Sequence, residues 1–412
     1  MTGNRSSLAN RLALRLESMR TAGLHRNPPR IDARHGAHLV TDGRRCVNFG
    51  SNDYLGLGTC PEWQRTVQSC FAAHAPSASS SRLVTGHLAE TEQLESAFAA
   101  RFGYEECLFF PSGYQANLAV ITGLLADADA ICFDRRIHAS MAHALAALGA
   151  REDGPALSGY AHGDISRLEQ KLRRHLDRPG AHLGEPAIAI LTESLFSMDG
   201  DTLCMPALHA AAKAHKAFTI VDEAHAMGAL GPCGLGLASH AVQKDTSRRQ
   251  GADIVVGTLG KALGLFGAFV LMPAGFKEYL SNIAAPVIYS TAMPPAFAAC
   301  ALAALDRVAG MDAERASLAR LGLLFRDQLA DGPFPLRGDA HILALEVGDE
   351  NRATRMAAAL REQGLLVFAA RHPTVPAGRA ILRISLTAAH GDDDITRLAQ
   401  ALRITAREIA LS

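Results

Sequence analysis

Short apolar runs alternate with helical patterns from about residue 60 to residue 290, and this alternation limits the possible folds more than any other feature of the chain. Helical patterns such as 90–102 and 115–125 separate the runs. Strands that are apolar on both faces and separated by helices are typical of a mostly parallel sheet covered on both sides. The sequence therefore predicts an α/β domain with strands at 107–110, 130–133, 187–192, 218–221, 254–256 and 268–272.

The two ends of the chain have different patterns. An Ala- and Leu-rich helical stretch follows Pro294 and Pro295 to about residue 329, and apolar runs at 341–347, 365–368 and 380–386 then alternate with helices. This order is typical of a smaller α+β unit. Leucines at helical spacing near the N-terminus precede a connector rich in Pro and Arg. We predict an N-terminal arm at 1–60, a large α/β domain at 61–300 and a small C-terminal α+β domain at 301–412.

Charge and cysteine content narrow the possible partners. The 412 residues include 41 Lys and Arg and 41 Asp and Glu, so the formal net charge is zero. This balance removes the electrostatic argument for nucleic acid or an anionic membrane. No apolar stretch approaches the roughly 20 residues of a membrane helix, and the N-terminus lacks the apolar block of a secretory signal. The eight cysteines form no Cys-x-x-Cys motif. We expect a cytoplasmic protein that binds small molecules, without metal, nucleic acid or membrane.

Polar residues directly follow several of the predicted strands. Asp222 and His225 follow one apolar run, Glu193 follows another, and Lys261 lies in a glycine-rich turn after a third. Singly, such an Asp is most often a helix cap and such a lysine a solvated surface charge. Ligands of open α/β sheets bind where the strands end. The combination therefore marks this edge of the sheet as the candidate site.

The glycine-rich turn around Lys261 matches none of the common phosphate-binding loops. A Walker A motif needs a glycine five positions before Gly260 and a Ser or Thr in place of Ala262. No Gly-x-Gly-x-x-Gly motif follows a strand, and no Gly-x-Ser-x-Gly elbow occurs. A lysine with a lowered pKa can instead form a Schiff base with an aldehyde, which is the chemistry of pyridoxal phosphate.

Pyridoxal phosphate needs three kinds of group from a protein. These are a lysine, a carboxylate at the pyridinium nitrogen and donors for the phosphate. Lys261 and Asp222 can supply the first two. Backbone N–H groups at a helix N-terminus bind phosphate, and His138 can lie flat over the ring. The predicted phosphate donors begin the helix after the 107–110 strand, at Ser112, Gly113 and Tyr114.

Eight motifs, taken together, resemble the α-oxoamine synthase family of pyridoxal-phosphate enzymes. They occur in family order and the likeness extends over about residues 45–390. The resemblance implies the aspartate-aminotransferase type of fold, and an enzyme that condenses an amino acid with an acyl thioester and releases CO2. The motifs are SNDYLGL (51–57), SRLVTG (81–86), SGYQAN (112–117), HAS (138–140), ESLFSMDGD (193–201), VDEAH (221–225), TLGK (258–261) and YSTAMPP (289–295).

The resemblance also implies roles for individual residues around the cofactor. Lys261 would bind the cofactor and move protons at Cα of the amino acid, and Asp222 would pair with the pyridinium nitrogen. His225 would contact the ring oxygen and His138 would stack on the ring. The family pattern makes the enzyme a homodimer whose site lies between the subunits. Further cofactor contacts are implied for Ser112, Gly113, Tyr114, Glu193, Ser197 and Thr258, and across the dimer for Ser290 and Thr291.

Substrate contacts are implied for four residues. Arg383 would clamp the amino-acid carboxylate, since a fixed guanidinium suits that group, and Asn52 would be the second contact. Thr374 would touch the acyl substrate. Arg26 would match an N-terminal substrate-binding arginine.

Two C-terminal strings favour one branch of the family. PTVPAG (373–378) and LRISLTAAH (382–390) are most similar to the branch of biotin biosynthesis, which implies L-alanine and a pimeloyl thioester of coenzyme A or acyl carrier protein. That branch usually has GSGGSR where this chain has SASSSR (77–82). The added side chains restrict the backbone and reshape the acyl pocket. A sister enzyme that uses glycine, serine or another acyl thioester therefore stays open, as does a scaffold that binds the cofactor without catalysis.

Overall fold

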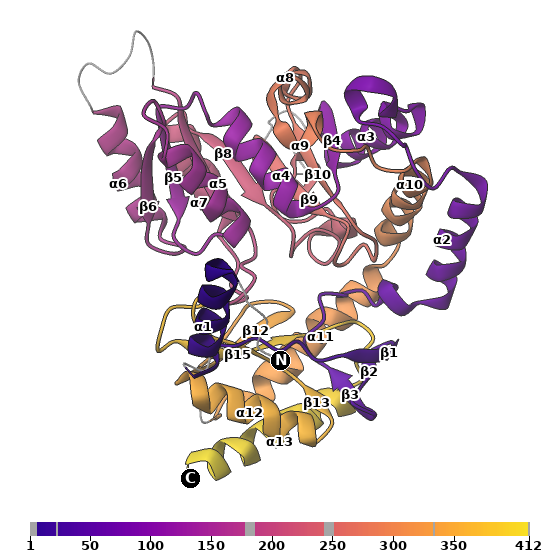
Figure 1. Ribbon diagram of the computed structural model, residues 1–412, viewed down its shortest axis with the longest axis vertical. Coiled ribbons are helices and arrows are strands. Elements are labelled where there is room, and N and C mark those ends of the chain that lie inside the picture. Colours follow the sequence, from indigo (N-terminus) through magenta and orange to yellow (C-terminus); the bar gives the residue numbers. More distant parts are fainter. Residues whose placement is uncertain (1–5, 22–23, 178–185, 243–250, 333, 411–412) are drawn as a thin grey trace.

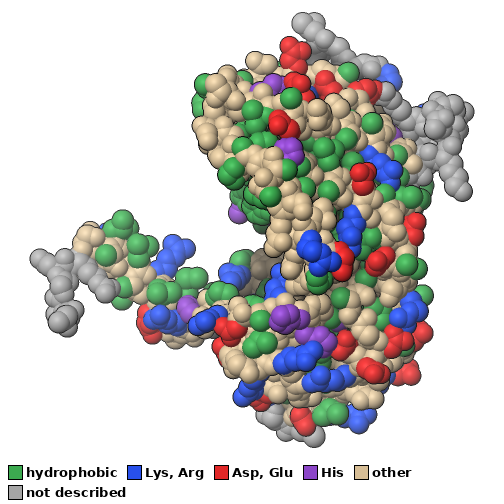
Figure 2. Space-filling view, turned by 90° about the vertical axis from the view of Figure 1, so that its right-hand side faces the viewer, with side chains coloured by type: hydrophobic (Ala, Val, Ile, Leu, Met, Phe, Trp, Pro, Cys, Tyr) green, Lys and Arg blue, Asp and Glu red, His purple; other side chains and the backbone are tan. Residues whose placement is uncertain are grey.

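The computed structural model has two lobes, a larger one built around a twisted central sheet and a smaller one that contains the C-terminus (Figure 1). It describes residues 6–21, 24–177, 186–242, 251–332 and 334–410. The N-terminal helix α1 (Ser7–Thr21) has no buried residue and projects from the body of the molecule (Figure 2). No described helix has the length and the hydropathy to cross a membrane.

The large lobe contains a seven-stranded sheet in the order β4-β10-β9-β8-β7-β5-β6. Strand β10 is antiparallel to both of its neighbours, β4 and β9, and every other pair in this sheet is parallel, so the mostly parallel sheet predicted from the sequence is confirmed. The strands are β4 (Glu106–Phe110), β5 (Ala130–Asp134), β6 (Ala156–Tyr160), β7 (Ile188–Glu193), β8 (Phe218–Asp222), β9 (Ile254–Thr258) and β10 (Ala268–Met272).

Helices cover both faces of this sheet, and two apolar clusters fill the two interfaces. Successive residues of a strand point to opposite faces. In β7, Ile188 and Ile190 belong to one cluster, whereas Ala189 and Leu191 belong to the other. Burial on both faces explains why these strands are continuously apolar. The helices are α2 (Pro61–Ala73), α3 (Ala89–Phe102), α4 (Gly113–Ala119), α5 (Ala139–Gly149), α6 (Ile165–Leu176), α7 (Met205–Ala214), α8 (Phe276–Ile283), α9 (Ala285–Ile288) and α10 (Pro295–Ala309).

The small lobe contains an antiparallel sheet in the order β11-β12-β15-β14 and a second sheet in the order β1-β2-β3-β13. Helix α13 packs against both α11 and α12. The elements are β1 (Ile31–His35), β2 (His38–Thr41), β3 (Arg44–Asn48), α11 (Asp312–Leu329), β11 (Leu336–Arg337), β12 (Ile342–Gly348), α12 (Glu350–Glu362), β13 (Leu365–Leu366), β14 (Phe368–Ala370), β15 (Ala380–Ser385) and α13 (Asp392–Ala410).

The structure refines several predicted elements. The helical stretch predicted to run to residue 329 is two helices, because α10 ends at Ala309 before Gly310 and α11 begins at Asp312. The run at 365–368 is divided between β13 and β14, which belong to different sheets. Strand β3 pairs in parallel with β13, so part of the predicted arm shares a sheet with the small lobe. The division at residues 60 and 300 stays a prediction.

Candidate active site at the carboxyl edge of the large sheet

The carboxyl ends of three neighbouring parallel strands, β7, β8 and β9, bring the predicted polar residues together. In the register of the sheet, Glu193 at the end of β7 lies opposite Asp222 at the end of β8, and Asp222 lies opposite Val256 of β9. Glu193 and Asp222 are both buried. The prediction that these strand ends form one polar edge is confirmed.

Lys261 lies in the turn that follows β9, and hydrogen bonds of Thr258 fix the shape of this turn. The Thr258 hydroxyl donates to the carbonyl of Gly267 at 2.9 Å and accepts from the Gly260 N–H at 3.2 Å. Burial lowers the pKa of Lys261 to about 8; Arg383 adds to this effect, and Asp222 opposes it. About a tenth of the amine is therefore neutral at pH 7 and about half at pH 8, and this fraction is available as a nucleophile or base.

Asp222 is held in one orientation by two donors. Its Oδ1 accepts from the Ala224 N–H at 2.8 Å and its Oδ2 accepts from Asn117 Nδ2 at 2.8 Å. Asn117 Nδ2 also donates to the Ser140 hydroxyl at 3.0 Å. A carboxylate has about four lone-pair positions, so Asp222 keeps the capacity to pair with a cationic ligand group.

His138 is linked to the same network through Ser140. The ring Nδ1 lies 2.8 Å from the Ser140 hydroxyl and accepts from the Ser140 N–H at 3.3 Å. A nitrogen that accepts carries no proton, so the neutral ring has its proton on Nε2. Burial lowers the pKa of His138 and Lys261 adds to the decrease, whereas Asp222 opposes it. The neutral, apolar ring face suits stacking on an aromatic ligand.

Two further predicted residues, His225 and Arg383, meet around Tyr54. The Tyr54 hydroxyl lies 2.6 Å from His225 Nδ1 and 3.1 Å from Asn52 Oδ1. Arg383 Nη2 donates to the same Asn52 oxygen at 3.1 Å, and Arg383 Nε donates to the Ser197 carbonyl at 2.5 Å. Burial holds the pKa of His225 well below its usual value, and the charge of Lys261 adds to this effect. His225 is therefore a neutral hydrogen-bonding group.

A cavity of about 710 Å³ lies between the two lobes, next to Ser197, whose carbonyl accepts from Arg383. His138 and Ser197 line it from the large lobe, and Thr374 lines it from the small lobe. The space-filling view shows the hollow between the lobes (Figure 2). The Tyr114 hydroxyl lies 2.8 Å from Nδ1 of His143, another lining residue.

Three of the predicted residues lie elsewhere in the described chain. Ser290 and Thr291 line a separate small cavity beside Arg82, and Thr291 forms a bridge with Ser81. Arg26 is exposed in the segment before β1. Their predicted roles stay predictions, and those of Ser290 and Thr291 depend on a second subunit.

The site also contains residues that the sequence motifs included without a role. Tyr54, Asn117 and Ser140 lie within three of the motifs. Tyr54 connects His225 to Asn52, and Asn117 and Ser140 together connect Asp222 to His138. These three residues could have been predicted as part of the site, because they lie in motifs that also contain predicted site residues. No comparable signal identified His341, whose ring centroid lies 4.1 Å from that of Tyr54.

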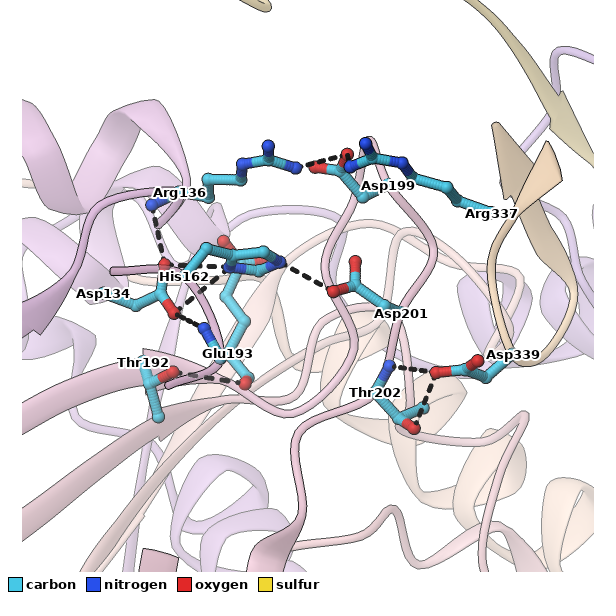
Figure 3. A network of polar contacts seen from close by, with 11 residues as sticks. Asp134, Arg136, His162, Thr192, Glu193, Asp199, Asp201, Thr202, Arg337 and Asp339 are labelled. Atoms are coloured by element: carbon cyan, nitrogen blue, oxygen red, sulfur yellow. Dashed lines mark hydrogen bonds and ion pairs between the residues drawn. The ribbon is translucent and has the colours of Figure 1, made fainter. Parts of the chain in front are cut away.

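An ion-paired histidine holds the loop after β7 against the rest of the large lobe (Figure 3). His162 Nδ1 lies 3.0 Å from Asp134 at the end of β5, and its Nε2 lies 2.7 Å from Asp201. Hydrogen bonds to these two carboxylates raise the pKa of His162 to about 9 although burial opposes the change. Although His162, Asp199 and Asp201 are close enough to hold a metal ion, both ring nitrogens already pair with carboxylates, so this cluster is explained as an ion-pair network.

His162 predicts a pH-dependent stability. Its pKa is about 9 in the folded protein and 6.5 as an ordinary value. The stabilisation is therefore fully present below pH 6.5 and lost as the pH rises through 9. The two values correspond to about 3 kcal/mol. We expect His162→Gln to lower the free energy of unfolding at pH 6 by roughly that amount and to leave a much smaller difference at pH 9.5, as measured by urea unfolding. An equal loss at both pH values would contradict a charged His162.

Buried polar atoms without partners indicate that the edge of the sheet accommodates a polar ligand. Oε1 of Glu193 and Oδ1 of Asn117 are buried and have no hydrogen-bond partner in the described part of the chain. Native proteins leave few such atoms unpaired, so each needs an explanation. At the start of α4, no described atom outside the adjoining residues and the helix's own backbone lies within 4 Å of the position that a Cβ on Gly113 would occupy. An amine, a carboxylate, two imidazoles and this open helix start fit a phosphorylated heteroaromatic aldehyde.

The fold and this edge are those of a large enzyme family. The aminotransferase class I and II family model matches residues 44–402, and the chain belongs to that family. It is 40% identical over 395 residues to an 8-amino-7-oxononanoate synthase of Stutzerimonas stutzeri (strain A1501), an alignment that covers 95% of both chains.

Two solved structures support the same grouping. Serine palmitoyltransferase from S. paucimobilis, solved with bound PLP and myriocin, has a TM-score of 0.84 and 26% identity over 99% of this chain and 100% of its own. An 8-amino-7-oxononanoate synthase from Francisella tularensis has a TM-score of 0.70 and 29% identity over 89% of this chain and 98% of its own. The family and the fold predicted from the sequence motifs are thus confirmed.

Proposed function

We propose that the protein is a pyridoxal-phosphate-dependent acyltransferase that forms 8-amino-7-oxononanoate from L-alanine and a pimeloyl thioester in biotin biosynthesis. The observation that carries this proposal is Lys261, whose pKa is lowered to about 8, at the strand edge that also presents Asp222. The 40% identity to 8-amino-7-oxononanoate synthase over nearly the whole chain supports the choice of reaction.

Each residue at the carboxyl edge of the large sheet would contact a different part of the cofactor. Lys261 would bind it covalently, Asp222 would pair with its ring nitrogen, and His138 would cover one face of the ring. His225 would donate to or accept from the ring oxygen, and its neutral state avoids a second buried charge. The N-terminus of α4, with Ser112, Gly113 and Tyr114, would bind the phosphate. Thr258 would join it once its hydroxyl turns from the Gly267 carbonyl. When bound, pyridoxal phosphate withdraws electrons and stabilises a carbanion at Cα of the amino acid.

Arg383 and Lys261 would control the amino acid. The Arg383 guanidinium is buried and held by Ser197, Ser385 and Asn52, so it is preorganised to bind the alanine carboxylate. Lys261, freed from the cofactor, would take the proton from Cα. Overall, a bond forms between Cα and the acyl carbon, while the C–S bond and the bond from Cα to the carboxylate break. Lys261 would return the proton to Cα after CO2 leaves, and the released thiolate would take a proton from solvent. The products are the amino ketone, CO2 and the free thiol.

The proposal also covers the oligomeric state, the acyl-substrate contacts, the cell compartment and the domain boundaries. We infer a homodimer in which Ser290 and Thr291 reach the partner's phosphate site, which is consistent with their position at a cavity separate from the one beside His138. Arg26 and Thr374 would contact the acyl substrate. The protein would act in the cytoplasm. Its N-terminal arm would end near residue 60, and its large domain would meet the small domain near residue 300.

Substrate selection is the decisive experiment. Purified protein with pyridoxal phosphate should form 8-amino-7-oxononanoate and CO2 from L-alanine and pimeloyl-CoA, detected by mass spectrometry. The panel should also contain glycine, L-serine, and acetyl and palmitoyl thioesters, because the serine palmitoyltransferase fold is so similar. Robust turnover of another pair, with none for alanine and pimeloyl-CoA, would assign the protein to a sister activity instead.

A further inference from the structure

The cavity between the lobes carries an excess of positive charge that the chemistry at Lys261 does not use. The lining includes four arginines, two carboxylates and no lysine among the described residues. The chain as a whole has zero formal net charge, so this excess of two charges is local. The four arginines are Arg135, Arg136, Arg337 and Arg379.

Three of these arginines form a continuous chain of ion pairs across the wall of the cavity. Asp199 pairs with Arg136 from the large lobe and lies 3.6 Å from Arg337 of the small lobe, and Figure 3 shows the two guanidinium groups meeting on this carboxylate. Glu346 pairs with Arg337 at 2.7 Å and with Arg379 at 2.7 Å. Each carboxylate is shared by two arginines, so the guanidinium groups are oriented but not neutralised.

An apolar surface lies beside this chain in the same cavity. Met198, Ala344, Val375 and Ile381 line the cavity and form one small hydrophobic cluster. His138 and Ser197, the lining residues that belong to the edge of the large sheet, complete the wall. A ligand in this space would therefore meet the reacting edge, a stretch of apolar contacts and a group of oriented guanidiniums.

We propose that Arg337 and Arg379 bind the distal carboxylate of a dicarboxylic acyl chain, with Arg136 supporting their orientation through Asp199. This inference rests on the proposed function and identifies the residues that select the acyl substrate. Methylene groups fit the apolar surface, and the planar fork of arginine binds a carboxylate with two parallel hydrogen bonds. A fatty acyl chain with a methyl end would leave the guanidinium groups without an anionic ligand.

The test compares acyl chains that differ only at the far end. For Arg337→Gln and Arg379→Gln, kcat/KM with pimeloyl-CoA should fall about 10- to 100-fold, as expected when a hydrogen bond to a charged group is lost. The value for the ω-methyl ester of pimeloyl-CoA should change less than threefold. Each single variant leaves Glu346 one arginine partner, which protects the fold. Arg320→Gln, which removes an exposed pair with Asp392, is the matched control and should change neither value.

A second arm separates the acyl carboxylate from the phosphates of coenzyme A. Pimeloyl N-acetylcysteamine thioester carries the same acyl chain without any phosphate, and the variants should lose the same 10- to 100-fold with it. A loss confined to the coenzyme A substrate, or an equal loss for acid and methyl ester, would overturn the inference while the proposed reaction stands. If the wild-type protein does not use pimeloyl thioesters, the proposed function is wrong, and the inference that rests on it is overturned as well.

Discussion

Replacing Lys261 by alanine is expected to reduce synthase activity by about 10⁴-fold or more, because the variant loses the group that binds the cofactor and moves the proton at Cα. Lys261 lies in the turn after β9 at the edge that presents Asp222, and its pKa is lowered to about 8. A lysine with an ordinary pKa would be almost fully protonated at neutral pH. The protein purified with pyridoxal phosphate should also lose its visible absorbance band, measured in the same preparation.

Two further variants isolate the cause of this loss. Lys261→Arg keeps a positive charge near Asp222 and Glu193 but cannot form a covalent bond to the cofactor, so it should be as inactive as the alanine variant. Lys213→Ala removes an exposed lysine near the end of α7 and should change neither activity nor absorbance. Retention of the visible band in Lys261→Ala would show that a different lysine binds the cofactor.

The sequence predicted those strands that are marked by a continuous run of apolar residues. The strands β7, β9 and β10 are buried along their full length, so continuous apolar runs identified them. The short strands β1 and β6 were missed, because their residues are mostly exposed or half-buried and lack that signal. The division of 365–368 between two sheets depends on contacts with β3 and β15, which are distant in sequence.

The residues of the candidate site could likewise be predicted only where a local sequence signal marked them. Asp222, Glu193 and Lys261 were found because parallel strands end at one edge. The pairing of His162 with Asp134 and Asp201 could not be found, since it joins residues 28 and 39 positions apart without a motif. The arginine chain of the cavity depends on how the two lobes face each other, which no local pattern encodes. Tertiary packing alone reveals such contacts.

Asp222→Asn is expected to lower kcat by about 10²- to 10³-fold, the usual effect of removing one preorganised electrostatic group from an active site. The shape of the side chain is kept, but the negative charge that would pair with the cofactor ring is lost. The amide must also present one NH2 group to either Ala224 N–H or Asn117 Nδ2, both of which are donors to Asp222. One hydrogen bond of the network therefore breaks in addition to the loss of charge.

Asn117→Ala tests whether this network positions Asp222 or only supports the fold. It removes the donor to Asp222 Oδ2 and to Ser140 while the carboxylate charge remains, so kcat should fall less than in Asp222→Asn and the visible absorbance band should shift rather than vanish. Asp253→Asn is the matched control, because Asp253 accepts from Thr219 at the opposite end of β8 and its replacement should leave kcat unchanged. Equal kcat values for Asp222→Asn and Asp253→Asn would mean that the charge of Asp222 does not contribute to catalysis, since both variants replace a carboxylate by an amide and only Asp222 lies at the candidate site.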